Sequence, residues 1–293
     1  MPHPGEGVVP EYLESTVRSL SSCHPACRTL FKYPIRYYLN YRKIPYSTHW
    51  VNFADIEAVC RERGIPPSKL VHSPGFKSEP KPIYTLPAIF DPNSNQYISE
   101  SAKIMRYLDD QFPANPSHSD HPAQNLNASM TYAGVAFPPH TLPLQTAFLS
   151  AFTAKVLVPV WPCIIPSVSA LLPEGRHRDA FNRTREDAYG RSVSAWAEDP
   201  QEVRSVRFEK VLRGWEGVGR WLDAGLEEGE ERRRAMFVMG NEPVFADYVI
   251  AATLAYMKNV FGEESGEWEE ICRYDRGRWS ALSRFWQEYD SAI

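Results

Sequence analysis

The spacing of apolar residues predicts strands and helices in the first part of the chain and helices alone in the rest. The clearest pattern spans residues 84–112. A short apolar run at 88–90 precedes turn residues at 91–95, and residues 97–98 resume the strand. From Glu100 onward, apolar residues recur every three or four positions, as on one face of a helix. The pattern therefore predicts strand, turn, strand and helix.

The segments before this stretch supply most of an α/β unit. Helical spacing over residues 31–39 predicts a helix that ends before Pro45. Alternation at 48–51 predicts a strand, and residues 55–64 predict a short helix that ends at a glycine. Together with the later hairpin and helix, this order is that of a thioredoxin-like domain in which only the first strand is unaccounted for.

The first strand is the weak point of this prediction. No alternating or β-branched run precedes residue 29. We therefore expect the sheet to lack a normal first strand, or to build a poor one from about residues 16–20. Residues 11–20 would instead suit a short helix.

The C-terminal half shows helical stripes without strand alternation, for example over residues 208–222 and 279–289. Residues 156–172 are uncharged but contain three prolines, which predicts a buried, kinked helix rather than a membrane span. Residues 113–127 are rich in Pro, Ser, His and Asn, as in a linker. The predicted divisions are a poorly defined segment at 1–22, an α/β domain at 23–114, a linker at 115–127 and an all-α domain at 128–293.

Composition agrees with a two-domain globular protein. The chain has 293 residues, 43% hydrophobic and 23% charged. A formal net charge of −4 gives no basic footprint for nucleic acid or for a membrane surface. The five cysteines are scattered, and the N-terminus has neither the basic start nor the apolar core of a signal peptide. These features predict a cytoplasmic protein.

Two short motifs carry a family resemblance. Leu86-Pro87 precedes the hairpin, and Glu100-Ser101 opens the following helix, where free backbone N–H groups suit the charged end of a small ligand. This arrangement resembles the glutathione-binding half of the glutathione transferase family. The resemblance implies a cis Pro87, a strand-like pairing of Leu86 with the glutathione backbone, and a γ-glutamyl group held by Glu100 and Ser101.

The resemblance extends over about residues 29 to 290. Within the family, the chain is similar to a fungal subgroup related to β-etherases and to transferases of secondary-metabolite clusters. It implies a thioredoxin-like α/β domain followed by an all-α helical bundle. It also implies one local departure. The family usually has Ser or Thr where this chain has Val244, three residues before Asp247, so half of a reciprocal helix cap is expected to be missing.

The resemblance places the catalytic hydroxyl at Thr29. A hydroxyl at a helix start lowers the pKa of a bound thiol by donating a hydrogen bond to the thiolate. Two other interpretations stay open: Thr29 as an ordinary helix cap, and Cys27 as the nucleophile of a thiol oxidoreductase. Cys23 and Cys27 are spaced C-x3-C, however, and redox motifs of that kind are C-x-x-C. Glu100 and Ser101 could likewise be ordinary first-turn residues.

The implied function is conjugation or transfer of glutathione, as co-substrate, to a small apolar electrophile. Family members are usually homodimers, so we expect a homodimer with no nucleic acid or membrane partner. His118, Asp120 and His121 fit no strong metal-ligand spacing, and no metal is expected. The alternative from a different class is a non-catalytic, transferase-like scaffold that binds glutathione or a partner protein. Two features favour that alternative: the expected lack of a normal first strand, and Leu30 and Phe31 where the resembling fungal proteins have Pro and Asn after the catalytic Ser.

Overall fold

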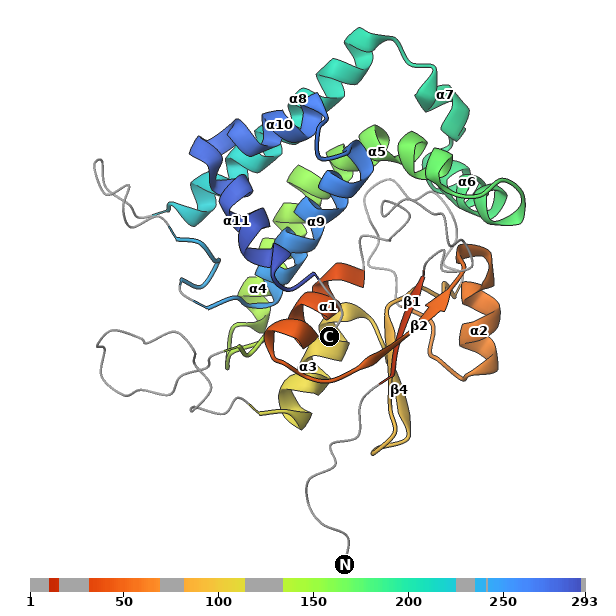
Figure 1. The fold of residues 1–293 in the computed structure, drawn as a ribbon, viewed down its shortest axis with the longest axis vertical. Coiled ribbons are helices and arrows are strands. Elements are labelled where there is room, and N and C mark those ends of the chain that lie inside the picture. Colours follow the sequence, from red (N-terminus) through yellow and green to blue (C-terminus); the bar gives the residue numbers. More distant parts are fainter. Residues whose placement is uncertain are drawn as a thin grey trace, which may run out of the picture.

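The structure is a computed structural model, shown as a ribbon in Figure 1. It describes residues 11–15, 32–68, 82–113, 134–224, 235–240 and 242–290. A small sheet with three helices forms one layer of the molecule, and a group of helices lies against it (Figure 1). The fold class expected from the sequence is confirmed.

The sheet has four strands in the order β2-β1-β3-β4. The strands are β1 (Glu11–Ser15), β2 (Ser47–Val51), β3 (Ala88–Asp91) and β4 (Gln96–Ser99). Strand β1 runs parallel to β2 and antiparallel to β3, and β3 and β4 form an antiparallel hairpin. One parallel pair and one hairpin joined in a single sheet is the thioredoxin-like arrangement.

The expectation of a missing or poor first strand was wrong. Strand β1 lies inside the sheet, with Leu13 opposite both His49 of β2 and Ala88 of β3. Residues 11–15 form this strand and not the start of the helix suggested at 11–20, while residues 16–20, where the sequence suggested the strand, lie outside the described residues. The segment Glu-Tyr-Leu-Glu-Ser has little β propensity of its own. Ladders on both of its sides supply the stabilisation, because strand formation depends on neighbours more than on propensity.

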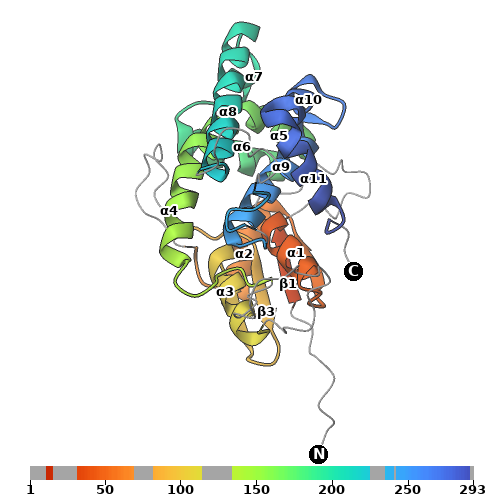
Figure 2. The ribbon, with the colours of Figure 1, turned by 90° about the vertical axis from the view of Figure 1, so that its left-hand side faces the viewer.

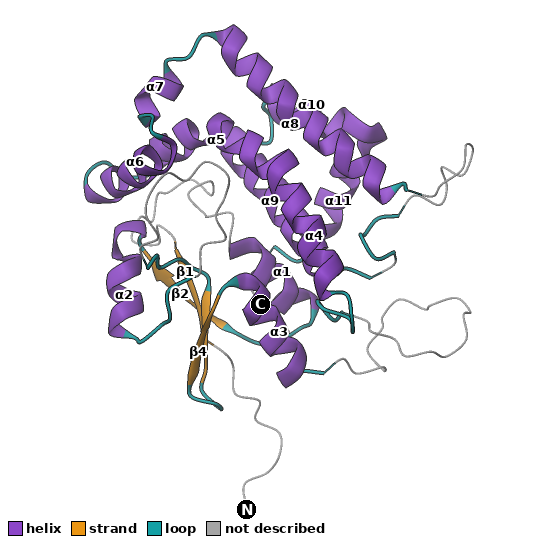
Figure 3. Cartoon of the chain, turned by 180° about the vertical axis from the view of Figure 1, so that it is seen from behind, coloured by secondary structure: helices purple, strands orange, loops and turns teal. Residues whose placement is uncertain are grey.

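Helices cover both faces of this sheet. Helix α2 (Ile56–Glu62) follows the short turn η2 (Phe53–Asp55) and packs with Ala88 in one apolar cluster. Helices α1 (Lys32–Tyr41) and α3 (Ser101–Gln111) pack with Ile89 in the larger core. Successive strand residues point to opposite faces, so Ala88 and Ile89 anchor the two sides. Figure 3 shows α2 and the α1–α3 pair on opposite sides of the orange strands.

Among its described residues, the second part of the molecule consists of helices and connecting loops, as expected, with one isolated β-bridge between Phe237 and Gly240. Its main helices are α4 (Leu142–Phe152), α5 (Val158–Leu171), α6 (Arg176–Tyr189), α7 (Val193–Ala197), α8 (Gln201–Leu222), α9 (Phe245–Phe261), α10 (Gly266–Arg273) and α11 (Arg278–Gln287). Their common core contains fully buried aromatic side chains, among them Trp215, Trp279 and Trp286. Figure 2 shows α4 and α8 on one flank and α10 and α11 on the other.

Helices α4 and α5 are joined through a π-helical turn, Thr153–Leu157. The whole run Leu142–Leu171 has 30 residues, and by length and composition it could cross a membrane; 28% of its most apolar stretch is buried. Its inward face packs against α8 and α9, with Val160, Ile164 and Ile165 buried. One face of the run therefore lies in the helical core, and α5 contains Pro162 and Pro166.

Helix α9 begins with the half cap that the sequence implied. The Asp247 carboxylate accepts the backbone N–H of Val244 at 2.9 Å and that of Val238 at 2.8 Å. The valine side chain offers no acceptor in return, and the N–H of Asp247 donates instead to the Val244 carbonyl at 2.9 Å. One side of the reciprocal cap is therefore replaced by a backbone bond.

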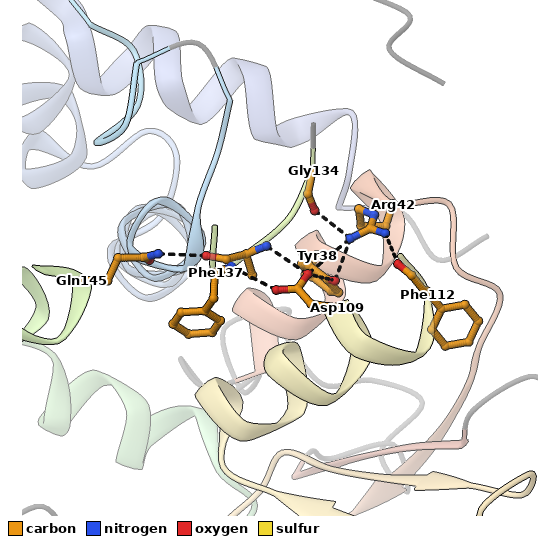
Figure 4. Close-up of polar contacts among 8 residues, drawn as sticks. Tyr38, Arg42, Asp109, Phe112, Gly134, Phe137 and Gln145 are labelled. Atoms are coloured by element: carbon orange, nitrogen blue, oxygen red, sulfur yellow. Dashed lines mark hydrogen bonds and ion pairs between the residues drawn. The ribbon is translucent and has the colours of Figure 1, made fainter. Parts of the chain in front are cut away.

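A polar network joins the sheet layer to the helical layer (Figure 4). Asp109 on α3 accepts the Tyr38 hydroxyl at 2.6 Å and the backbone N–H groups of Ala136 and Phe137 at 3.1 and 3.0 Å. Arg42 donates to the Tyr38 hydroxyl and to the Gly134 carbonyl, both at 2.9 Å. The carboxylate thus ties α1 and α3 to the segment that enters the helical layer.

Gln145 extends this junction into the helical core. Its side-chain amide donates to the Ala136 carbonyl at 3.0 Å and accepts the N–H of Ala246 on α9 at 3.1 Å. Gln145 is only 1% exposed, so both of its polar ends are matched inside the protein. Gln145 therefore joins the segment at 136–137 to α9 inside the helical layer.

Candidate glutathione site

The β3–β4 hairpin brings the two predicted motifs together. Ala88 lies opposite Ser99, so Leu86-Pro87 at the start of β3 and Glu100-Ser101 after β4 are adjacent at the same end of the hairpin. The peptide bond between Leu86 and Pro87 is cis, as the resemblance implied. Sequence positions separated by the whole hairpin thus form one short surface.

Glu100 has an unusual backbone conformation for a residue with a side chain. Its φ is 72° and its ψ is 122°, outside the regions that such residues usually adopt. Backbone strain of this kind concentrates at ligand sites, where the surrounding fold enforces it. The Glu100 side chain makes no hydrogen bond that caps α3 and instead pairs with Lys103 at 2.8 Å. The Glu100 side chain is 26% exposed and can be reached by a ligand.

Ser101 is the first residue of α3. The first intrahelical bond runs from the N–H of Ile104 to the Glu100 carbonyl at 2.9 Å, so the earlier N–H groups have no acceptor within the helix. These groups and the helix dipole make the end of α3 attractive to a negative charge. Ile104, Met105 and Leu108 are fully buried and hold the helix in place.

The segment after α2 forms the neighbouring wall. The Ser99 hydroxyl donates to the Pro66 carbonyl at 3.2 Å, and the Ser68 N–H donates to the Ile83 carbonyl at 2.8 Å. The Ser68 hydroxyl also contacts that of Thr85. These bonds fix the chain immediately before Leu86, which is buried. Hydrogen bonds from Ser99 and Ser68 therefore hold the chain next to the cis peptide before β3 in place.

The residues predicted to be catalytic are not among those that the structure describes. Thr29, Cys27 and Cys23 fall outside the described residues, as do the histidines and aspartate considered for a metal at 118–121. The assignment of Thr29, and of Cys27 as its alternative, therefore stays a prediction. Within the described ranges, no group of three or more His, Cys, Asp or Glu side chains could hold a metal ion.

A second cluster faces the sheet layer from the helical layer, and sequence reasoning missed it. Arg185 on α6 lies over the ring of Phe181, with 4.7 Å between the guanidinium carbon and the ring centroid. Trp161 of α5 and Phe53 of η2 lie at 5.9 and 6.0 Å. Phe53 also packs against the small cluster that contains Leu86. No local pattern signals this grouping, because its members come from three separate elements.

Comparison with known proteins identifies the family. The family described as "Glutathione S-transferase, C-terminal domain" matches residues 143–289, half of the chain, and "Glutathione S-transferase, N-terminal domain" matches residues 33–111. The chain belongs to the glutathione S-transferase family. Both motifs of the candidate site lie within the N-terminal match.

Individual glutathione S-transferases resemble the chain over most of its length. A curated relative, the glutathione S-transferase-like protein ustS of Aspergillus flavus, is 26% identical and covers 85% of this chain and 79% of its own. The structure of CsGST63524 of Ceriporiopsis subvermispora in complex with glutathione is 29% identical, with a TM-score of 0.79 and coverage of 97% and 99%. CsGST83044 of the same organism, also in complex with glutathione, is 29% identical, with a TM-score of 0.78 and coverage of 96% and 98%. The expected glutathione transferase family is thereby confirmed, and these three relatives are fungal proteins.

Proposed function

We propose that this glutathione S-transferase binds glutathione at the Leu86-Pro87 and Glu100-Ser101 surface and transfers it to a small apolar electrophile. The observation that carries the proposal is the hairpin register, which places the cis peptide beside the strained start of α3. Two similar structures were determined with glutathione bound. The sequence relationship and the local geometry therefore support the same ligand.

Each part of the surface has a chemical task in this proposal. The backbone of Leu86 pairs with the glutathione backbone in the manner of a strand. Glu100 accepts hydrogen bonds from the γ-glutamyl ammonium group, and Ser101 with the N–H groups of α3 donates to its carboxylate. The thiol loses its proton to solvent water, the thiolate sulfur forms a bond to the electrophilic carbon, and the leaving group departs with the electron pair of the bond that breaks. Thr29 would donate a hydrogen bond to that thiolate.

Binding and chemistry are separable by experiment. Ser101→Ala should weaken glutathione binding by about 1–3 kcal/mol, measured by calorimetry, because ligand polar groups lose their partner. Ser205→Ala changes an exposed serine on α8 and serves as the matched control, with unchanged binding. Thr29→Ala should leave binding nearly intact and slow conjugation of a chlorodinitrobenzene by roughly ten- to a thousand-fold.

The alternatives give different outcomes in the same assays. Glutathione binding without turnover would support the non-catalytic scaffold. The expected absence of the first strand had favoured that alternative, but β1 is present in the sheet. Full turnover of Thr29→Ala with loss of activity in Cys27→Ala would support the oxidoreductase. Wild-type protein that neither binds glutathione nor turns over an electrophile would contradict the proposal.

Assembly and location form the remaining part of the proposal. We propose a homodimer, supported by the exposure of Leu142 and Leu144 on α4, at 37% and 67%. Sedimentation velocity that shows only the 33.4 kDa monomer would contradict it. We also propose a cytoplasmic protein. Cys60, Cys163 and Cys272 are free thiols, as is usual for proteins of a reducing compartment.

A further inference from the structure

Arg185 has aromatic neighbours where an arginine in a protein usually has a carboxylate. Its guanidinium lies within 4.7–6.0 Å of the ring centroids of Phe181, Trp161 and Phe53. Among the described residues, no aspartate or glutamate forms an ion pair with Arg185, and its buried Nε has no hydrogen-bond partner. The site thus holds a cation without a counter-charge from these residues.

Other arginines of the helical layer are paired. Arg191 and Arg207 both contact Asp199, at 2.6 and 2.5 Å. Arg178, on the same helix as Arg185, contacts Glu174 and donates to the Leu172 carbonyl. The absence of an acidic partner within the described residues is therefore a property of the Arg185 position and not of the fold in general.

An unpaired guanidinium in this setting carries an energetic cost. Burial lowers the pKa of Arg185, with opposing contributions from Tyr256 and Tyr189, yet an arginine stays protonated at neutral pH. Taking a cation out of water is unfavourable unless an anion or polar acceptor replaces the water. Aromatic faces recover part of this cost through cation–π attraction. A bound anion would recover much more.

The position of Arg185 connects it to the glutathione surface. Helix α6 packs against η2, which carries Phe53, and Phe53 shares an apolar cluster with Leu86. Figures 1 and 3 both show α6 above α2 on the side of the molecule where the helical layer meets the sheet. A ligand that contacts Phe53 and Arg185 would therefore lie between the two layers.

We propose that Arg185, Phe53, Trp161 and Phe181 form a binding site for a planar aromatic ligand that carries a carboxylate. This deepens the proposed function, on which it rests, because it names the chemical class of the second substrate. The guanidinium fork donates two parallel hydrogen bonds to the carboxylate, the partly exposed rings of Phe53 and Trp161 contact the ligand ring, and the buried ring of Phe181 lies under the guanidinium. Arg185 then selects aromatic acids over neutral aromatic compounds of the same shape.

Two matched probes test the selection without any conjugation step. Binding of 2-naphthoate and of 2-naphthamide is measured by calorimetry at pH 7, where only the first is an anion. We expect wild-type protein to bind the acid about tenfold to a hundredfold more tightly than the amide, as a charge-assisted pair allows. Arg185→Met should abolish this preference and leave the affinity for the amide within about twofold, because its apolar bulk remains.

Two further variants make the result specific. Arg185→Lys keeps the charge but loses the planar fork, so it should keep only part of the preference. Arg183→Met removes an exposed arginine from the same helix and should keep the full preference for the acid over the amide. Thermal unfolding separates binding from packing. Arg185→Met should melt no lower than Arg183→Met, since it removes a buried cation that the described residues leave without a counter-charge.

Several outcomes would overturn the inference. Wild-type protein that binds both probes equally, or does not bind 2-naphthoate, would contradict it. So would an Arg183→Met protein that loses the preference for the acid as Arg185→Met does. An Arg185→Met protein that melts at a lower temperature than Arg183→Met and keeps the preference would also contradict it. Glutathione binding is measured on the same samples. Loss of glutathione binding with retained 2-naphthoate selection would contradict the proposed function alone.

Discussion

Asp247 shows at the scale of one residue how burial and hydrogen bonding compete. The carboxyl is 1% exposed. Burial raises its pKa to about 7, although the N–H groups of Val244 and Val238 act in the opposite direction. The unfolded chain would release the same proton near pH 4. Between these values the folded protein binds more protons than the unfolded chain does.

This difference predicts a direction for stability against pH. The contribution of Asp247 to the free energy of unfolding is complete below about pH 4 and is lost as pH rises to about 7, a change of up to about 4 kcal/mol. Asp247→Asn cannot titrate, so its free energy of unfolding, measured with urea, should lack this fall between about pH 4 and about pH 7. An equal fall in both proteins would contradict the assignment. A free energy of unfolding that rises with pH in the wild type alone would mean that the two N–H groups lower the pKa of Asp247 more than burial raises it.

Helix α8 shows at the scale of elements how one position sets the distance between neighbours. A Cβ placed on Gly214 would lie 2.1 Å from the carbonyl oxygen of Lys155, in the π-helical turn between α4 and α5. Backbone atoms cannot move aside as a flexible side chain can. The glycine is therefore what allows α8 to approach the turn closely.

Substitution of this glycine should push the two helices apart. We expect Gly214→Ala to lower the free energy of unfolding by about 1–3 kcal/mol or more, as overpacking does, measured by urea titration. Gly217→Ala is the matched control on the same helix, because a Cβ there meets nothing within 4 Å. The control should gain up to about 1 kcal/mol from helix propensity. A Gly214→Ala protein as stable as this control would refute the close contact.

Local and non-local elements differ in how far the sequence predicts them. The hairpin and α3 were predicted because their signals follow one another within residues 84–112. These signals are the turn residues, the helical spacing of apolar residues and the residues that begin the helix. Strand β1 was not, because its stability comes from ladders with residues 47–51 and 88–90. The Leu86-Pro87 and Glu100-Ser101 motifs were found together because one hairpin joins them. Arg185 was missed because its ring partners lie on three elements that meet only in the folded chain.

Asp109 connects elements at the scale of the whole molecule. It accepts hydrogen bonds from α1 and from the backbone at 136–137, and it pairs with Arg42 at 3.4 Å. Burial raises the pKa of Asp109, while the bonds from Tyr38 and the two N–H groups counteract the rise. The carboxylate is thus an acceptor shared by the two layers.

Removal of this acceptor should loosen the layers from one another. Asp109→Ala leaves the Tyr38 hydroxyl, two N–H groups and one guanidinium without their shared carboxylate, a loss of about 3–5 kcal/mol for a buried pair. We expect a lower melting temperature and, by calorimetry, separate transitions for the two layers. Asp110→Ala changes the exposed neighbour and should melt as wild type does. A single, unshifted transition in Asp109→Ala would show that the junction does not depend on this residue.

The contact between α1 and α11 has a consequence for the timing of synthesis. The Asn40 side chain donates to the Tyr289 carbonyl at 2.7 Å, and Tyr37 lies 5.1 Å from Trp286, so the first helix is covered by residues made some 249 positions later. At about 5–20 residues per second, a ribosome needs roughly 10–50 s to travel that distance. During this interval the side of α1 that packs against α9 and α11 lacks these partners, although α3 has already been made. The nascent sheet layer is therefore a natural client for chaperones until α9 and α11 emerge.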